Sequence, residues 1–270
     1  MDINFYKLQV LKNDFILCDL RNKASINESF FSSAAVSICD RRSGVGGSGI
    51  IYILSADTDS TVMQTYSSDG SLYEFVYDSS LIASRYIFDM ISVSGKTIKI
   101  INNNIPVTAQ IIDSMNFRIS AGNPLFNDKI TENLIVDNYT YNYTQINLQK
   151  KNGIIFFPEN KSADELKELG RKLLKSSTHD KSFPVYIFPA ARNSITAKTV
   201  KNYRHPDNSL ICCIASVAAS LNGYDNELLV MLHKSAAYVE WDRINNEVYI
   251  SAKPEYSFTG SYYFDEKNSR

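Results

Sequence analysis

The sequence is poor in the residues that would assign it to several large classes of protein. It has 4 cysteines in 270 residues, too few for a disulfide-stapled scaffold, and no Cys-x-x-Cys pair. Its 11 glycines and 7 prolines exclude a fibrous or low-complexity chain. Lys and Arg total 28 against 29 for Asp and Glu, a net charge of −1, and no stretch concentrates either sign. This argues against a nucleic-acid or membrane-surface function, because both use basic patches.

Long apolar runs are also missing. The most apolar stretch, residues 210–221, is shorter than the roughly 20 residues that a membrane-spanning helix requires. Near the amino terminus, Asp2, Lys7, Lys12 and Asp14 stand where a signal peptide keeps an uncharged core. Together with the low cysteine content, these features predict a cytoplasmic protein without a membrane partner.

What is present is the pattern of a mixed α and β protein, with 44% hydrophobic residues. Capping boxes at residues 25–28 and 162–165 predict two helices, the first ending near residue 38 and the second with Leu166, Leu169, Leu173 and Leu174 on its apolar face. The second helix should therefore cover the outside of a sheet. Alternation of apolar and polar residues predicts strands over residues 49–54, 74–77, 97–101, 105–112, 135–148, 153–157, 238–241 and 247–252.

Two further segments are apolar all round. Residues 79–90 and 212–221 have few or no charges, which is typical of a helix that is surrounded by protein. Related turn sequences precede them, Asp-Gly-Ser-Leu at residues 69–72 and Asp-Asn-Ser-Leu at residues 207–210. The sequence thus predicts two similar lobes, each built around one buried helix.

Several segments, in order, resemble the diaminopimelate epimerases, a cofactor-independent family that inverts an amino-acid α-carbon. They cover almost the whole chain, at residues 7–15 (KLQVLKNDF), 39–47 (CDRRSGVGG), 68–71 (SDGS), 83–86 (ASRY), 120–124 (SAGNP), 183–184, 204, 239–241 and 248–250. The resemblance implies an α/β (α+β) fold with two pseudo-symmetric lobes, each a curled and mainly antiparallel sheet around a central helix.

The resemblance also implies how the chain is divided and what it binds. Residues 1–117 and 258–270 would form the N-terminal lobe and residues 118–257 the C-terminal lobe, with the last strand returning to the first lobe. A small amino-acid-like ligand would lie between the lobes, without a cofactor, and the protein would be a homodimer. No metal is expected, because the neighbours of His179, His205 and His233 supply no metal-ligand spacing.

In this family two cysteines carry the chemistry: one thiolate removes the α-proton and the opposite thiol returns a proton to the other face of the carbon. In the present sequence Cys212 falls on the second catalytic cysteine, whereas Val76 falls on the first. Valine has no exchangeable proton. The sequence leaves two interpretations of Cys212 open, an acid or base at a helix N-terminus and a small buried apolar residue beside Cys213.

The positions that would hold the substrate have also changed. Tyr77, Asp78 and Ser79 stand in a glycine-rich helix start of the family, and residues 213–215 (Cys-Ile-Ala) replace its Gly-Thr-Gly. Those glycines let amides approach a substrate carboxylate, so Asp78 sets a negative charge beside an anionic group. The predicted substrate-binding residues are Asn13, Asn123 and Arg204, which match family positions, Ser67, which stands where an asparagine is expected, and Asp78.

The sequence therefore predicts an epimerase-like protein with an altered active site, lacking two-cysteine activity and binding a ligand or a partner. One alternative is an active isomerase that uses Cys212 and a non-cysteine partner, for which Asp78, Tyr77 and His205 are the candidates. A third hypothesis is a structural subunit beside a true epimerase.

Overall fold

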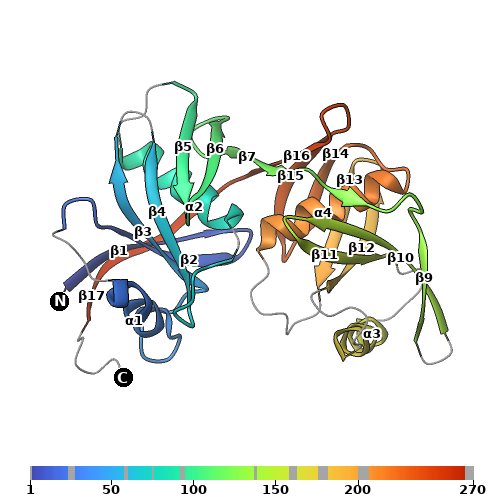
Figure 1. The fold of residues 1–270 in the computed structure, drawn as a ribbon, viewed down its shortest axis with the longest axis horizontal. Helices are drawn as coiled ribbons and strands as arrows, with labels where there is room; N and C mark the ends of the chain where they lie inside the picture. The colour runs from blue at the N-terminus through green and yellow to red at the C-terminus, as the bar shows by residue number, and fades with distance from the viewer. Residues whose placement is uncertain are drawn as a thin grey trace. The chain divides into compact units, whose positions relative to one another are not determined.

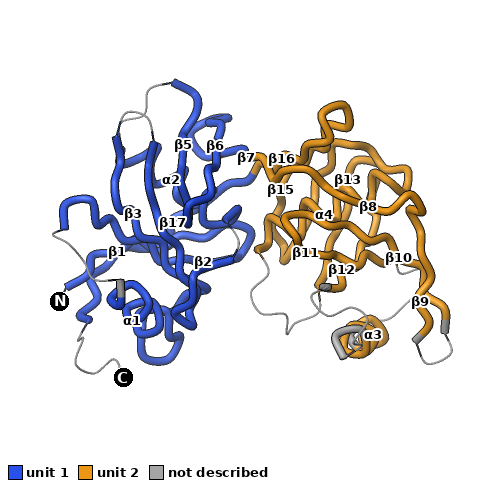
Figure 2. Tube along the Cα trace, in the orientation of Figure 1, with its two compact units in different colours: residues 1–119, 252–270 blue, residues 120–251 orange. Residues whose placement is uncertain are grey.

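The computed structural model describes residues 2–23, 28–57, 60–74, 76–91, 95–136, 139–157, 163–175, 182–199 and 207–264. The chain divides into two compact units (Figure 2): unit 1 comprises residues 1–119 and 252–270, and unit 2 comprises residues 120–251. The sequence-based boundaries lie at 117/118 and 257/258, so residues 118–119 and 252–257, placed in the C-terminal lobe by the sequence, group with unit 1. No helix among the described residues is long and apolar enough to cross a membrane.

Unit 1 is a curled sheet with one helix inside it and one outside (Figure 1). The strand order is β17-β1-β2-β3-β4-β5-β6-β7, and only the β2/β3 and β4/β5 pairs are parallel. Pairing of β17 with β1 confirms that the last strand returns to the first lobe. The elements are β1 (Asp2–Val10), β2 (Asn13–Asp19), α1 (Glu28–Cys39), β3 (Gly49–Ala56), β4 (Thr61–Ser67), α2 (Tyr77–Met90), β5 (Thr97–Asn102), β6 (Ile105–Ile111), β7 (Phe117–Gly122) and β17 (Glu255–Tyr263).

Unit 2 repeats this plan. Its order is β10-β11-β12-β13-β14-β15-β16, with β8 and β9 also paired to β10, and only the β11/β12 and β13/β14 pairs are parallel. The elements are β8 (Leu125–Phe126), β9 (Glu132–Val136), β10 (Tyr139–Leu148), β11 (Lys151–Phe156), α3 (Ala163–Lys175), β12 (Ser182–Ala191), β13 (Ser194–Thr199), α4 (Asn208–Leu221), β14 (Glu227–Leu232), β15 (Ser235–Asp242) and β16 (Glu247–Ala252).

The repeat extends to the backbone of the turns. Leu11 and Lys12, between β1 and β2, have φ of 50° and 66°, and Gln149 and Lys150, between β10 and β11, have φ of 53° and 62°. Positive φ at two successive residues is the signature of a tight hairpin whose twist matches the strands that it joins. The predicted pair of similar lobes is therefore confirmed in strand order, helix placement and turn conformation.

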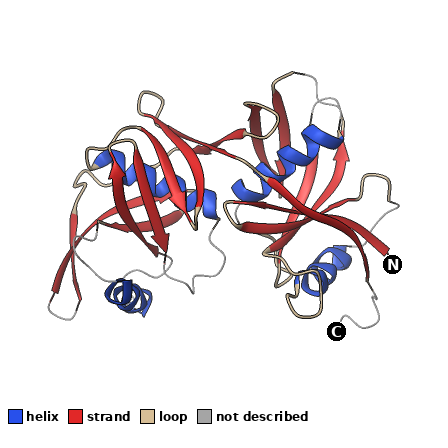
Figure 3. Ribbon diagram, turned by 180° about the vertical axis from the view of Figure 1, so that it is seen from behind, coloured by secondary structure: helices blue, strands red, loops and turns tan. Residues whose placement is uncertain are grey.

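Each central helix is buried because the sheet curls round it. In unit 1 α2 contacts β1, β2, β5 and β6, and in unit 2 α4 contacts all strands from β10 to β15. In each unit the strands curve round a helix (Figure 3). Every residue of α4 except Leu221 is buried. A helix with no exposed face needs no charged residues, which is the pattern that the sequence shows. The prediction of two central helices is confirmed.

The outer helices cover the opposite faces of the sheets. α1 packs Phe30, Phe31 and Ile38 against Tyr52 of β3, and the Tyr52 hydroxyl donates to the carbonyl of Phe31. α3 packs Leu166 and its neighbour Leu169 against β12, as its sequence pattern predicts. The side chains of Leu173 and Leu174, and the residues 25–27 and 162 of the capping boxes, lie outside the part of the chain that is described.

Two predicted strands are wrong. Residues 74–77 form no strand where they are described, because Tyr77 already begins α2 and Leu72 makes only an isolated bridge to Tyr66. The segment 135–148 is not one strand but the β9–β10 hairpin, in which Tyr141 pairs with Leu134. Its alternation continues through both strands, so periodicity alone does not separate β9 from β10.

The left-handed hairpin turns provide a stability test. We expect Lys150→Gly to raise the free energy of unfolding of unit 2 by about 1 kcal/mol, because a Cβ atom is disfavoured at positive φ and glycine is not. The single tryptophan, Trp241, lies in unit 2, so its fluorescence during urea unfolding measures the change. Lys150→Ala is the control, since alanine keeps the Cβ atom and should give no such gain.

Candidate functional site

The start of α2 is the first place at which the resemblance predicts chemistry. Val76 is its N-cap, with φ −119° and ψ −5°, and its side chain makes no capping hydrogen bond. The residue is buried, with 5% of its surface exposed. The position that the resemblance matches to a catalytic thiol therefore carries a branched hydrocarbon at the end of the helix.

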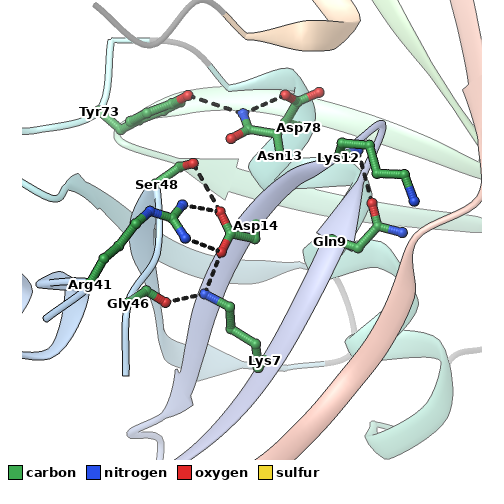
Figure 4. A network of polar contacts seen from close by, with 10 residues as sticks. All are labelled: Lys7, Gln9, Lys12, Asn13, Asp14, Arg41, Gly46, Ser48, Tyr73 and Asp78. Atoms are coloured by element: carbon green, nitrogen blue, oxygen red, sulfur yellow. Dashed lines mark hydrogen bonds and ion pairs between the residues drawn. The ribbon is translucent and has the colours of Figure 1, made fainter. Parts of the chain in front are cut away.

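A carboxylate of the protein itself stands in the first turn of α2. Asp78 is fully buried, and its Oδ2 accepts a hydrogen bond of 2.7 Å from Nδ2 of Asn13 (Figure 4). The same Nδ2 atom lies 3.5 Å from the hydroxyl of Tyr73. A negative charge in this turn is favoured by the helix dipole. Asp78 thus occupies the electrostatically favourable position for an anion, and Asn13 donates to it.

A buried polar chain continues behind this helix start. Nδ2 of Asn102 donates to Oγ of Ser79 at 2.8 Å, and the hydroxyl of Thr65 donates to Oδ1 of Asn102 at 3.0 Å. Ser67, at the end of β4, is also buried, and its amide donates to the carbonyl of Ser71 in the turn that follows. The bond from Asn102 to Ser79 therefore joins the first turn of α2 to the end of β5.

A second network lies beside the first, around Asp14 (Figure 4). Lys7, which is buried, contacts the Asp14 carboxylate at 2.8 Å, and Arg41 contacts it at 3.1 Å through Nη1. Lys7 also donates to the carbonyl of Gly46, and the hydroxyl of Ser48 donates to Asp14 at 3.2 Å. Burial opposes ionisation of Asp14, but the hydrogen bonds and charges of Arg41 and Lys7 outweigh it and lower the pKa of Asp14 to about 2.

The loop that closes this network depends on glycine. Gly46 has φ of +80°, which glycine adopts without strain, and a Cβ atom on Gly47 would lie 3.1 Å from Nζ of Lys7. The loop therefore runs close enough to β1 for its carbonyl to accept from the buried ammonium. The glycines of residues 44–47, which are part of the resemblance, here let the loop pack closely against Lys7 and accept a hydrogen bond from its ammonium group.

The start of α4 differs from that of α2. Asp207 is the N-cap, and its Oδ1 accepts from the amide of Leu210 at 3.1 Å. The helix consequently begins at Asn208, four residues before the predicted start at Cys212. The amide groups in the first turn of a helix have no carbonyl partner within the helix, and the Asp207 carboxylate accepts a hydrogen bond from one of them.

Cys212 lies in the second turn of α4 and is fully buried. Cys212 is the fifth residue of α4, so its amide belongs to the regular helical hydrogen bonds and not to the first turn, where amides lack such partners. Ile214 belongs to the segment that aligns with the family's Gly-Thr-Gly. Its side chain lies over β11, and a Cβ atom on Gly153 would be 2.5 Å from its Cγ2 atom. Cys212 is therefore a buried residue within α4, and both interpretations of its role stay predictions.

Thiol accessibility can be measured. All four cysteines are buried in the described chain, and none forms a disulfide. Burial raises the pKa of the Cys39 thiol to about 12 and raises that of Cys18 further. We expect N-ethylmaleimide at pH 8 to add to none of the four in the folded protein and to all four in urea, by intact-mass spectrometry. Rapid labelling of Cys212 in the folded state would contradict this placement.

The remaining predicted site residues are placed as follows. Asn123 of unit 2 donates through Nδ2 to the carbonyl of Asn246 at 2.6 Å, and Asn246 donates in turn to the carbonyl of Pro124. Arg204 and His205 lie outside the described residues, so their predicted roles stay predictions. Among the residues that are described, no group of three or more His, Cys, Asp or Glu side chains could hold a metal ion.

Sequence reasoning missed several members of the two networks, among them Tyr73, Asn102 and Lys7. Asn102 opens an Asn-Asn-Asn run between two predicted strands, which indicated only a turn. Lys7 and Asp14 both lie in the first segment of the resemblance, but they are seven residues apart. Only the antiparallel register of β1 and β2, in which Lys7 is opposite Ile16 and Gln9 opposite Asp14, brings them together.

No protein-family model matches the chain. Among curated proteins, the sequence is similar to diaminopimelate epimerases. The enzyme of Desulforapulum autotrophicum is 27% identical, and the alignment covers 96% of this chain and 99% of the relative. The enzyme of Rippkaea orientalis is also 27% identical, over 97% of this chain and 99% of the relative. The chain therefore matches these proteins over nearly its full length.

Solved structures show the same fold. A phenazine biosynthesis protein of the PhzF family from Enterococcus faecalis has a TM-score of 0.70 at 10% identity, covering 98% of this chain and 100% of its own. A hydroxyproline epimerase from Agrobacterium vitis, solved with trans-4-hydroxy-L-proline bound, has a TM-score of 0.66 at 9% identity, covering 99% and 94%. At such identities the likeness establishes the fold alone.

The fold is thus one that racemases, epimerases and isomerases share, two strand-rich lobes each with a central helix. Within that class, the resemblance of the chain to the diaminopimelate epimerase family is confirmed by relatives at 24–27% identity over nearly the full length. The chain is thus similar to the diaminopimelate epimerases over nearly its full length, at an identity that leaves most positions different.

Proposed function

We propose that this chain does not catalyse two-thiol epimerisation and instead binds a ligand or a partner. The observation that carries the proposal is that neither central helix begins with an accessible thiol. Val76 caps α2, and Cys212 is buried in the second turn of α4. Inversion needs one group to remove the α-proton and another to deliver a proton from the opposite face, both within hydrogen-bond reach of the substrate.

The electrostatics of unit 1 support the same proposal. A substrate carboxylate at the start of α2 would meet the carboxylate of Asp78, which already takes the amide of Asn13. Two carboxylates at one helix end repel each other, and burial strengthens the repulsion because the surroundings screen it weakly. An anionic amino acid is therefore a poor ligand for this helix start as long as Asp78 is ionised.

The proposal is tested by stereochemical conversion. Purified protein is incubated with L,L-diaminopimelate, and the meso isomer is measured by chiral chromatography, with a true diaminopimelate epimerase as the positive control. We expect no meso product above the protein-free blank. Conversion that disappears in Cys212→Ser would refute the proposal. A rise of the melting temperature with ligand concentration, in the same samples, would support a binding role, as mass action requires.

Asp78 gives a prediction with a defined sign. We expect Asp78→Asn to strengthen binding of diaminopimelate, seen as a larger rise in melting temperature at equal ligand concentration, because the repulsion at the start of α2 is removed. Asp89→Asn, near the other end of α2, removes the same charge and is the matched control. An unchanged or smaller rise in Asp78→Asn would show that the helix start does not bind the ligand's carboxylate.

The buried carboxylate also favours a second candidate function, an isomerase in which Asp78 transfers the proton with Cys212 or another group as its partner. A buried carboxyl group can act as a general base if its substrate reaches it. This alternative predicts α-hydrogen exchange that survives in Cys212→Ser and is lost in Asp78→Asn. The binding proposal predicts no exchange in any of these proteins.

We further propose that the protein is a cytoplasmic homodimer, and that Asn13, Asn123, Ser67, Asp78 and Arg204 are binding positions for a small amino-acid-like ligand. The resemblance to the epimerases supports both statements. Light scattering of the purified protein tests the first: twice the chain mass of 30.5 kDa is expected, and a value near the chain mass would refute a dimer.

A further inference from the structure

Unit 2 contains a cavity that the proposed function does not use. Its volume is about 560 Å³, within the range of small-molecule sites. Its walls come from β10, β11, β12, α3 and the residues after α4, all described parts of unit 2. The cavity includes Asn222, the C-cap of α4, so it lies at the opposite end of that helix from Asp207 and the first turn. It is therefore separate from the helix start that the resemblance marks.

Aromatic rings dominate one part of this cavity. The rings of Phe157 and Tyr224 both line it and are parallel within 6°, with centroids 6.3 Å apart. Phe156 and Tyr143 add a tilted pair, with centroids 6.1 Å apart. Flat faces of this kind bind flat rings by offset stacking, and a base stacked on an aromatic side chain contributes substantially to affinity.

The polar groups of the cavity wall are neutral. They belong to Thr131, Thr140, Asn142, Thr144, Asn222 and the tyrosines Tyr141, Tyr143 and Tyr224, and none of the residues that line the cavity has a charged side chain. An anion or a cation would lose its hydration there without gaining a counter-ion. The carboxyl end of α4 adds partial negative charge, which further disfavours an anionic ligand.

Two of these groups are already oriented. Nδ2 of Asn222 donates both to Oγ1 of Thr144, at 3.0 Å, and to the carbonyl of Ala218, at 2.8 Å. Both hydrogens of that amide are therefore engaged, which leaves its Oδ1 atom as an acceptor. The Thr144 hydroxyl accepts from Asn222 and keeps its own hydrogen as a donor. A donor and an acceptor are thus held side by side, next to stacked rings.

From this geometry we infer that the cavity binds neutral, flat ring compounds that have a hydrogen-bond donor and acceptor along one edge. Pyrimidine and purine nucleosides without a phosphate have this chemistry. The ring would stack on Phe157 and Tyr224, and its edge would pair with Thr144 and Asn222. The inference concerns unit 2 alone and does not depend on whether the helix starts bind or react.

The test uses uridine as the probe and uridine 5′-monophosphate as its charged match, measured by saturation-transfer difference NMR on the full chain. We expect uridine base protons to receive saturation, with a Kd of about 0.1–1 mM for a ligand of this size, and weaker binding of the monophosphate. Absence of saturation transfer from uridine up to about 5 mM, well above that Kd, would overturn the inference. Equal affinity for uridine and its monophosphate would also overturn the inference, because it would show that the uncharged cavity wall does not discriminate against an anion.

Variants locate the binding. Phe157→Leu should weaken uridine binding at least about five-fold through lost stacking, and Thr144→Val should weaken it through the lost hydroxyl. Phe126→Leu, which removes a ring of unit 2 outside the cavity, should leave it unchanged. Circular dichroism checks folding, and if Phe157→Leu does not fold, Tyr224→Leu takes its place. If the folded cavity variants bind uridine as tightly as the wild type does, the assignment of uridine to this cavity is wrong.

Discussion

Asp14→Asn should lower the free energy of unfolding by about 2–3 kcal/mol at pH 7. Removing one member of a buried ion pair leaves the other charge without compensation, which is costly, and Lys7 is the member left behind with 7% of its side chain exposed. The expected loss is below that of a fully buried pair because 24% of the Asp14 side chain is exposed to water. Urea unfolding followed by circular dichroism measures it.

The pH dependence of this loss has a definite sign. The pKa of Asp14 is about 2 in the folded protein and about 3.9 in an unfolded chain, so the folded state binds the proton less tightly. The stabilisation by Asp14 is therefore fully present above about pH 4 and is lost as the pH falls through about 2. The stabilities of wild type and Asp14→Asn should converge in that window.

Two controls distinguish the ion pair from a general charge effect. Asp2→Asn removes an exposed carboxylate on the same strand pair and should change stability by less than about 0.5 kcal/mol. The double variant Lys7→Met/Asp14→Asn should be more stable than Asp14→Asn alone, because no unpaired charge stays buried. If the double variant is less stable than the single one, Lys7 and Asp14 do not interact as described.

Gly153→Ala should destabilise unit 2 by about 2 kcal/mol. The new methyl group would lie 2.5 Å from Cγ2 of Ile214, and both residues are enclosed between β11 and α4. The side chain of Ile214 branches at Cβ, so it cannot rotate away freely. Tryptophan fluorescence during urea unfolding measures the loss, since Trp241 lies in the same unit.

A double-mutant cycle makes this prediction specific. Ile214→Ala alone should cost about 2–5 kcal/mol through the cavity that it leaves. Gly153→Ala/Ile214→Ala should be more stable than the sum of the two losses indicates, because the added methyl group fills part of that cavity. Strict additivity would mean that Ile214 does not pack over Gly153, and the segment of residues 213–215 would then be free to face a ligand.

The sequence predicts the fold well where burial determines the pattern. The second apolar segment, inside α4, lacks charges because every position but Leu221 is buried, so composition alone identified it as central. Trp241 and the alternation of residues 247–252 likewise fall on strands, β15 and β16, as predicted.

Helix starts were less predictable, and they are where the candidate site lies. The α4 start moves from Cys212 to Asn208 because the Asp207 carboxylate caps it, although the same aspartate also fits an ordinary turn. That shift of one turn carries Cys212 away from the helix end. Local patterns cannot resolve it, since both starts leave the apolar periodicity unchanged.

The polar networks of unit 1 were the least predictable part. Asn13 and Asp78 are 65 residues apart, and each could be matched to a substrate contact by resemblance. The structure joins them by a hydrogen bond. No spacing rule connects them, because the contact depends on how β2 lies against the start of α2.

The most direct test of the proposed loss of epimerisation is α-hydrogen exchange in deuterium oxide, followed by proton NMR on L,L-diaminopimelate. Exchange detects removal of the α-proton even when no proton is delivered to the opposite face, so it reports a single working acid or base. We predict that the α-proton signal keeps its full intensity over many hours with wild-type protein. Loss of the signal with wild type, abolished by Cys212→Ser, would show that the buried thiol reaches substrate and would contradict the proposal.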